Sequence, residues 1–295
     1  MNTASELKLT QNSYYVASAN QTLNYPTLED NIDTDVCVVG GGFAGLSAAI
    51  ELADRGYKVV ILEAHHIGFG ASGRNGGQLI AGLACDQDVI EKALGIEAAK
   101  QIWSMSLEAL SLVHERVKRF EIQCDLTAGF MGVTVNANKT NKLNAWLDDM
   151  AQRYAYEVKR ITPDEITTWI NSPRYHSGYY DPNGGHIHPL NYCLGLAKGA
   201  ASLGVQIFTN SAVTAMQQGD TAVLHTEKGT VKAKFVVLAG NMYLPEISPK
   251  LAPRLNKRIM PVGTSIIGTE PINPTLASTL IPNNAAVCDT NFVLD

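Results

Sequence analysis

The sequence predicts an α/β protein whose first domain is built on a parallel sheet. An apolar run over residues 36–39 leads into Gly40, Gly42 and Gly45, which have the spacing G-x-G-x-x-G. A second apolar run ends at the acidic residue Glu63, close to the roughly 20 residues after the last glycine at which such an acid is expected. The order strand, glycine turn, helix and strand is typical of a parallel α/β sheet.

The three glycines and the acid serve one binding chemistry. Gly40 permits a tight turn, Gly42 lets the backbone approach a pyrophosphate, and Gly45 lets helix and strand pack closely. Free N–H groups and the positive dipole end of the helix receive the phosphates. The carboxylate of Glu63 accepts a hydrogen bond from a ribose hydroxyl. The pattern alone does not separate NAD from FAD, so an NAD(P)-linked dehydrogenase stays an alternative.

Composition narrows the class of protein. A chain of 295 residues with 45% hydrophobic and 17% charged residues has the composition of a soluble globular protein with room for two packed domains. A net charge of −5 argues against nucleic acid and anionic membranes as partners, and no apolar stretch is long enough to span a bilayer. Five scattered cysteines without a C-x-x-C pair indicate reduced thiols, and therefore a cytoplasmic protein.

The first half of the chain reads as a leader, a βαβ unit and an inserted region. We expect residues 1–34 to lie over the surface of the fold, and the helix of the βαβ unit to stop at Gly56. Apolar residues at steps of three and four predict a long helix over residues 88–119. After it we expect a strand at 126–136, helices at 139–154 and 163–170, and an extended segment at 174–188.

The second half indicates a return to the nucleotide-binding domain. We expect a helix from Pro189 to Gly204, followed by short strands at 205–209, 212–216, 222–226 and 231–234 and an apolar strand at 235–240. The predicted domains are therefore the leader 1–34, a dinucleotide-binding domain over 35–78 and 186–245, and a substrate domain over 79–185 and 246–295.

Two features favour FAD over NAD. A second glycine-rich loop, Gly70–Gly77, begins soon after Glu63, and its backbone N–H groups, the Ser72 hydroxyl and Arg74 can approach a pyrophosphate and an isoalloxazine. A charged residue such as Arg74 inside a glycine loop is typically there for an anion or a flavin. The strands expected over 211–234 are typical of a flavoprotein β-meander. The alternative interpretation of the loop is a flexible surface turn.

Several stretches together resemble one protein family. VCVVGGGFAGLSAAIELADRGYKVVILEA (36–64), GFGASGRNGGQ (68–78), GGHIHPLNYCLGLAKGAASLGVQIF (184–208), KGTVKAKFVVLAGNMYL (228–244) and RIMPVGTSIIGTEP (258–271) resemble the FAD-dependent D-amino-acid oxidase/sarcosine oxidase superfamily. SYYVASAN (13–20) is similar to the leader of gamma-glutamylputrescine oxidoreductases. The resemblance implies an FAD-binding Rossmann-like domain with a β-meander plus an α+β substrate domain.

The resemblance also implies which residues border the FAD. They are Gly40, Gly42, Phe43, Ala44, Gly45, Glu63, Ala64, Gly70, Ala71, Ser72, Arg74, Asn75, Gly76, Gly77, Val213, Ala239 and Gly240. The FAD is expected to be non-covalent, because the loop at 72–77 offers no His or Cys to which the flavin could be linked. The catalytic residues stay unassigned. A metal is not expected, because His186 and His188 lack a third ligand nearby. We expect these two histidines to share a strand face in a hydrogen-bonded structural role, with acid–base chemistry as the alternative.

The implied activity is FAD-dependent oxidative deamination of a small-molecule amine by O₂, giving an aldehyde, ammonia and H₂O₂. The implied substrate is gamma-glutamylputrescine, within putrescine catabolism. The alternatives are a glycine/sarcosine or D-amino-acid oxidase and an inactive, truncated FAD-binding fragment. The last arises because the family has a further C-terminal portion, whereas this chain stops at the strand-like residues 291–295.

Overall fold

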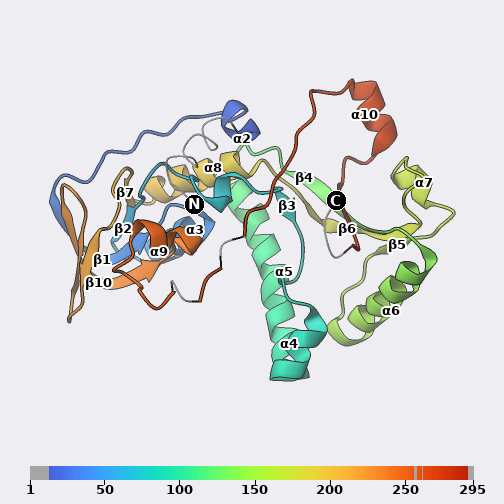
Figure 1. Cartoon of the computed structure of the whole chain (residues 1–295), viewed down its shortest axis with the longest axis horizontal. Coiled ribbons are helices and arrows are strands. Elements are labelled where there is room, and N and C mark those ends of the chain that lie inside the picture. The colour runs from blue at the N-terminus through green and yellow to red at the C-terminus, as the bar shows by residue number, and fades with distance from the viewer. Residues whose placement is uncertain (1–12, 256–257, 261, 292–295) are drawn as a thin grey trace. The chain divides into compact units, whose positions relative to one another are not determined.

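The computed structural model describes residues 13–255, 258–260 and 262–291, and these residues form two compact units (Figure 1). Of the described residues, unit 1 contains those in 13–76, 116–124 and 188–267, and unit 2 contains those in 77–115, 125–187 and 268–291. Residues 1–12 of the predicted leader and residues 292–295 of the predicted terminal strand lie outside the described residues.

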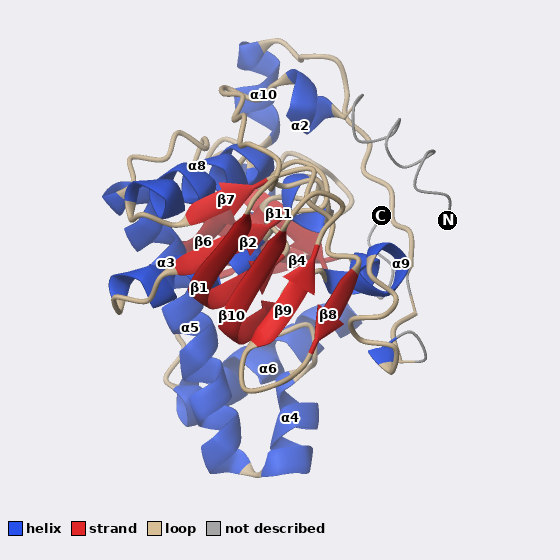
Figure 2. Cartoon of the chain, turned by 90° about the vertical axis from the view of Figure 1, so that its left-hand side faces the viewer, coloured by secondary structure: helices blue, strands red, loops and turns tan. Residues whose placement is uncertain are grey.

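Unit 1 contains a six-stranded sheet with the order β7-β2-β1-β10-β9-β8, seen side by side in Figure 2. The first four strands are parallel, and the last two are antiparallel, as a β-meander requires. The strands are β1 (Asn31–Val39), β2 (Val59–Leu62), β7 (Gln206–Phe208), β8 (Ala215–Gln217), β9 (Ala222–His225) and β10 (Thr230–Leu238).

Helices and loops bury this sheet on both faces. Helix α3 (Phe43–Asp54) packs against β1, β2 and β10, and α8 (Pro189–Ser202) packs against α3 and β7. A separate core cluster joins the sheet to Leu28, Val213, Leu244 and Leu251. Burial of the central strands explains why β1 and β2 end in unbroken apolar runs instead of alternating ones. Unit 1 also contains the short helices α2 (Tyr14–Ala17), η1 (Ala71–Gly73), η2 (Asn241–Tyr243) and α9 (Leu244–Ile247).

Unit 2 is built on a second, mostly antiparallel sheet with the order β11-β4-β6-β3, to which β5 adds through β6. Its strands are β3 (Gln78–Leu79), β4 (Thr127–Thr134), β5 (Lys159–Ile161), β6 (Ser177–His186) and β11 (Ala286–Asp289). Its helices are α4 (Gln87–Leu94), α5 (Ile96–Arg119, whose last turn belongs to unit 1), α6 (Ala137–Tyr154), α7 (Ile166–Trp169) and α10 (Pro274–Leu280).

Several predicted elements differ from the structure, among them the helix expected over 163–170, which is only the four-residue α7 (Ile166–Trp169). The helix expected over 88–119 is two helices, because Gly95 between them has a φ of 82°. The strands expected over 231–234 and 235–240 are one continuous strand, β10, which pairs with β1 along its length. His186 ends β6 and His188 caps α8, so the two histidines do not share a strand face.

The unit boundaries also differ from the predicted domains. Residues 116–124 belong to unit 1, where the Arg116 guanidinium lies 3.0 Å from the Glu51 carboxylate of α3 and Arg119 makes a bidentate pair with Asp54. Residues 246–267 belong there too, because Leu251 is part of the sheet's core cluster. Within the described ranges no helix could cross a bilayer, and no group of three or more His, Cys, Asp or Glu side chains could hold a metal.

Candidate functional site

The turn between β1 and α3 has the backbone that a dinucleotide site requires. Gly40 has a φ of 117°, and a Cβ there would lie 2.6 Å from the Ala239 carbonyl oxygen. A Cβ on Gly45 would lie 2.0 Å from the Gly40 carbonyl oxygen. Side chains are excluded at both positions because backbone atoms of β1, β10 and α3 approach each other directly. Backbone packing therefore sets the shape of the turn at these two glycines.

Helix α3 presents amide donors at its positive end. Its N-cap residue, Gly42, has no side chain to satisfy the first amides. The N–H of Phe43 donates to the Ser72 hydroxyl at 3.0 Å. The amides of Gly42 and Ala44 have no hydrogen-bond partner in the part of the chain that the structure describes. Unpaired amides and the helix dipole together make this turn an anion site.

Glu63 is fastened to the same turn. One carboxylate oxygen accepts from the Gly41 N–H at 2.6 Å, and the other accepts from the His65 N–H at 2.9 Å. A carboxylate has about four lone-pair positions, so two remain for further donors such as ribose hydroxyls. The acid at the end of β2 and the amides of α3 thus converge on one place, as the sequence pattern predicts.

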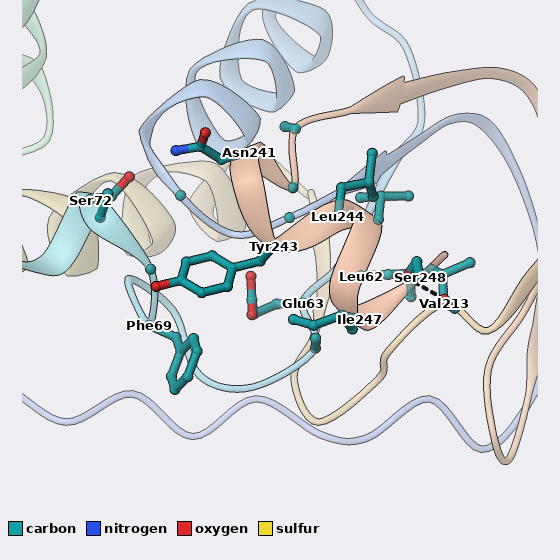
Figure 3. A pocket seen from close by; sticks show the side chains of 18 residues that line it. Leu62, Glu63, Phe69, Ser72, Val213, Asn241, Tyr243, Leu244, Ile247 and Ser248 are labelled. Carbon is teal, nitrogen blue, oxygen red and sulfur yellow. Dashed lines mark hydrogen bonds between the residues drawn. The ribbon is translucent and has the colours of Figure 1, made fainter. Parts of the chain in front are cut away.

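A cavity of about 90 Å³ opens beside Glu63 (Figure 3). It is bordered by the ends of β1, β2 and β10, by the loop at 69–72 and by the segment 239–248. The predicted site residues that line it are Gly40, Gly42, Glu63, Ala64, Gly70, Ala71, Ser72, Val213, Ala239 and Gly240. The structure therefore brings together residues from four distant stretches of the sequence.

The cavity also has walls that were not among the predicted site residues, namely Val39, Leu62, Phe69, Asn241, Tyr243, Leu244, Ile247 and Ser248. Val39 and Leu62 are the last residues of β1 and β2, so the ends of the apolar runs in the sequence could have identified them as cavity walls. The buried Ser248 donates its hydroxyl to the Val213 carbonyl oxygen at 2.5 Å, which closes the cavity floor. No motif marks Ser248, because this bond joins residues far apart in the chain.

The remaining predicted residues lie outside this cavity, and they are Phe43, Ala44, Gly45, Arg74, Asn75, Gly76 and Gly77. Arg74 donates to the Tyr243 hydroxyl, and its guanidinium lies over the rings of Phe69 and Tyr243, 5.7 and 5.9 Å from their centroids. These contacts pin the second glycine loop to the segment that walls the cavity. An anion or flavin contact of Arg74 stays a prediction.

Two buried thiols and His65 near the turn favour their neutral forms. Cys193 lies 3.7 Å from the Gly41 carbonyl oxygen, and burial strongly raises the pKa of its thiol. Burial raises the pKa of the Cys37 thiol to about 12. Neither thiol is a nucleophile at neutral pH. Burial lowers the pKa of His65, whose ring stacks on Phe69 with centroids 4.0 Å apart.

The histidines singled out in the sequence have structural roles. His188 is the N-cap of α8 and accepts the Asn191 N–H at Nδ1, while its Nε2 lies 3.0 Å from the Ser18 hydroxyl. The His186 Nε2 lies 2.9 Å from the Asn284 carbonyl oxygen. Each ring is engaged by the protein itself, as the expectation of hydrogen-bonded structural histidines required.

Comparison with known proteins assigns the family. Residues 35–294 match the family described as FAD dependent oxidoreductase. The chain belongs to this family. FAD is the cofactor of this family. The glycine turn, the free amides of α3 and the acid at the end of β2 together suit its phosphates and ribose.

Two members of the FAD-dependent oxidoreductase family are similar over nearly the whole chain. A gamma-glutamylputrescine oxidoreductase of Escherichia coli is 44% identical over 283 residues, covering 96% of this chain and 66% of that protein. A probable oxidoreductase OrdL of Haemophilus influenzae is 40% identical over 96% of this chain and 66% of that protein. The chain thus spans about two thirds of the length of these relatives.

Solved structures show the same fold at lower identity. A glycine oxidase from Geobacillus kaustophilus superposes with a TM-score of 0.61 and 23% identity, over 76% of this chain and 59% of that one. An L-amino acid deaminase from Proteus myxofaciens gives a TM-score of 0.63 and 21% identity, over 76% of this chain and 49% of that one. The chain therefore shares the α/β fold of these two enzymes.

Proposed function

We propose that this protein binds FAD without a covalent link and oxidises gamma-glutamylputrescine to an aldehyde, with release of ammonia and H₂O₂. The observation that supports the substrate is the 44% identity to a gamma-glutamylputrescine oxidoreductase over 96% of this chain. The cavity beside Glu63 and the anion-binding end of α3 support the cofactor.

The cavity suits the adenosine end of the cofactor. Its volume of about 90 Å³ is below the roughly 300–1,000 Å³ of a site that encloses a drug-sized ligand. We therefore place adenine and ribose there, with Glu63 accepting from the ribose and the Val213 segment beside the base. The pyrophosphate then lies at the amides of Gly42 and Ala44. The rest of the cofactor runs along the loop at 70–76.

The protein's part in the reaction is binding and orientation. Bound FAD would supply the redox chemistry, as a hydride acceptor for the carbon beside the amine nitrogen and a two-electron donor to O₂. Water would hydrolyse the resulting imine to the aldehyde and ammonia. The glycine turn excludes side chains from the pyrophosphate, and Arg74 joins the loop at 70–76 to Tyr243. No proton transfer by a side chain is needed if the amine reaches the cofactor unprotonated.

The test is a substrate screen on the purified, FAD-loaded protein. Under anaerobic conditions gamma-glutamylputrescine should bleach the flavin absorbance faster than putrescine, glycine, sarcosine or D-alanine. In air the same substrate should give H₂O₂. Faster bleaching by D-alanine or by glycine and sarcosine would move the protein to the amino-acid oxidases of the family. A protein that takes up no FAD would contradict the proposal at its first step.

A further inference from the structure

The segment at residues 13–20 reaches the second glycine loop through one side chain. The Tyr15 hydroxyl donates to the Asn75 carbonyl oxygen at 2.5 Å, across 60 residues of sequence. Burial raises the pKa of Tyr15 above its ordinary value of 10.0. The hydroxyl therefore keeps its proton at neutral pH and remains a donor to this carbonyl.

The same segment is anchored at the start of α8. The Tyr15 ring meets the His188 ring edge-on, with centroids 5.2 Å apart. The Ser18 hydroxyl donates to the Tyr14 carbonyl oxygen at 2.6 Å, so it accepts from the His188 Nε2 at 3.0 Å. His188 accepts at Nδ1 from the Asn191 N–H, which requires the same neutral tautomer, with the proton on Nε2. The N-terminal end of α8 thus fixes the position of Tyr15.

The bond from Tyr15 fixes the direction of a second group. A peptide unit is planar and trans, so the N–H of Gly76 points opposite to the Asn75 carbonyl that Tyr15 holds. Gly76 is exposed, and among the described residues its N–H has no hydrogen-bond partner. A glycine also leaves this amide open to close approach. The loop therefore presents one free donor whose direction depends on Tyr15.

We propose that Tyr15 is a positioning residue for the cofactor, which holds the Asn75–Gly76 peptide so that the Gly76 N–H faces the flavin. This inference rests on the proposed function, because it requires FAD to border residues 70–76. A loop fixed before binding loses less conformational freedom when the cofactor arrives, and this raises affinity. The segment at 13–20 then links the start of α8 to the loop at 70–76.

The first arm of the test uses the FAD-free protein and hydrogen exchange. Tyr15→Phe removes the hydroxyl and keeps the ring against His188. Tyr14→Phe is the matched control, since Tyr14 is 70% exposed and no hydrogen bond of its hydroxyl is seen within the described residues. Loss of one hydrogen bond predicts about 5-fold faster exchange of the amides at 70–76 in Tyr15→Phe. Ser18→Ala, which removes the hydrogen bond between this segment and His188, should give a smaller increase in the exchange rate of these amides.

The second arm measures FAD affinity and the visible spectrum of the bound flavin. Tyr15→Phe should raise the Kd for FAD about 5- to 10-fold and shift the flavin absorption maximum, while Tyr14→Phe changes neither. Equal exchange, Kd and spectrum in the two variants would overturn the inference. A wild-type chain that binds no FAD contradicts the proposed function, and the exchange comparison then still decides whether Tyr15 fixes the loop.

Discussion

The turn at Gly40–Gly45 and the loop at Gly68–Gly73 each contain two glycines five residues apart, but their surroundings differ. In the first, a Cβ on Gly45 would lie 2.0 Å from the Gly40 carbonyl oxygen, and in the second a Cβ on Gly73 would lie 2.1 Å from the Gly68 carbonyl oxygen. The leading glycine has a positive φ in both, 117° at Gly40 and 72° at Gly68. The first pair leads the chain from β1 into α3, and the second leads it from a turn at 67–70 into η1.

The two glycine pairs differ in the elements that hold them. The first leads into α3, and its leading glycine is held by the sheet, since the Gly40 N–H donates to the Leu62 carbonyl oxygen at 2.9 Å. The second leads into the three-residue helix η1 and is held by distant side chains, Tyr15 at Asn75 and Tyr243 at Arg74. A local glycine spacing therefore sets the shape of a turn, whereas its neighbours in space set its rigidity.

The largest loss of stability is expected for Gly45→Ala. The equivalent substitution in the second loop, Gly73→Ala, is its comparison. Both methyl groups meet a carbonyl oxygen, but β1 and α3 cannot separate without opening the core. Gly45→Ala should lower the free energy of unfolding by about 3 kcal/mol and Gly73→Ala by about 1 kcal/mol, because η1 can shift. Urea unfolding measures both, with Gly219→Ala as control, where a Cβ meets only the Thr221 carbonyl oxygen at 3.4 Å. Equal losses would show that the two loops are equally rigid.

The second prediction concerns Gly42, where the two segments touch. A Cβ there would meet the Ser72 hydroxyl at 2.8 Å, a group that can rotate away, so the stability of Gly42→Ala should stay near that of the wild type. The methyl group still obstructs the pyrophosphate position and displaces Ser72 from the Phe43 N–H. The Kd for FAD should rise about 10- to 100-fold, which is about 1.4–2.8 kcal/mol.

A double variant separates the two causes at Gly42. If adding Ser72→Ala to Gly42→Ala restores FAD affinity, the contact with Ser72 was the cause. If affinity stays low, the methyl group itself blocks the phosphate, as the glycine spacing predicts. Ser72→Ala alone serves as the control for the lost hydrogen bond, and fluorescence titration of FAD measures all three variants.

The third prediction concerns Glu63, which ties Gly41 of the first segment to His65 near the second. Glu63→Gln has one acceptor oxygen in place of two, so its NH₂ group must face one of the two backbone N–H donors. The free energy of unfolding should fall by about 1–2 kcal/mol, and FAD affinity should fall with it. Glu227→Gln, on an exposed turn, should change neither. Unchanged stability would mean that the carboxylate serves only the cofactor.

The two segments also show how much a sequence can predict. The turn at Gly40–Gly45, the acid at the end of β2 and the order of the elements around them follow from local spacing, and the structure has them in place. Tyr243 and Leu244 lie in the stretch 228–244 that carries the family resemblance, but nothing local in the sequence marks them as cavity walls. Ser248 lies outside all of the motifs. The break at Gly95 was missed since helical periodicity continues on both sides of it.

The smallest effect is expected from His65, whose backbone N–H donates to Glu63 and whose ring lies against Phe69. Burial lowers its pKa below the ordinary 6.5, and its Nε2 is buried without a hydrogen-bond partner among the described residues, so the folded protein favours the neutral ring. The unfolded chain then binds more protons just below pH 6.5, and the stability that His65 contributes above that pH is lost as the pH falls through this range. His65→Phe keeps a ring on Phe69 and cannot be protonated. The fall in Tm from pH 7.5 to 5.5 should therefore be smaller in His65→Phe than in the wild type or in the control His114→Phe, and an equal fall in all three would place the acid sensitivity elsewhere.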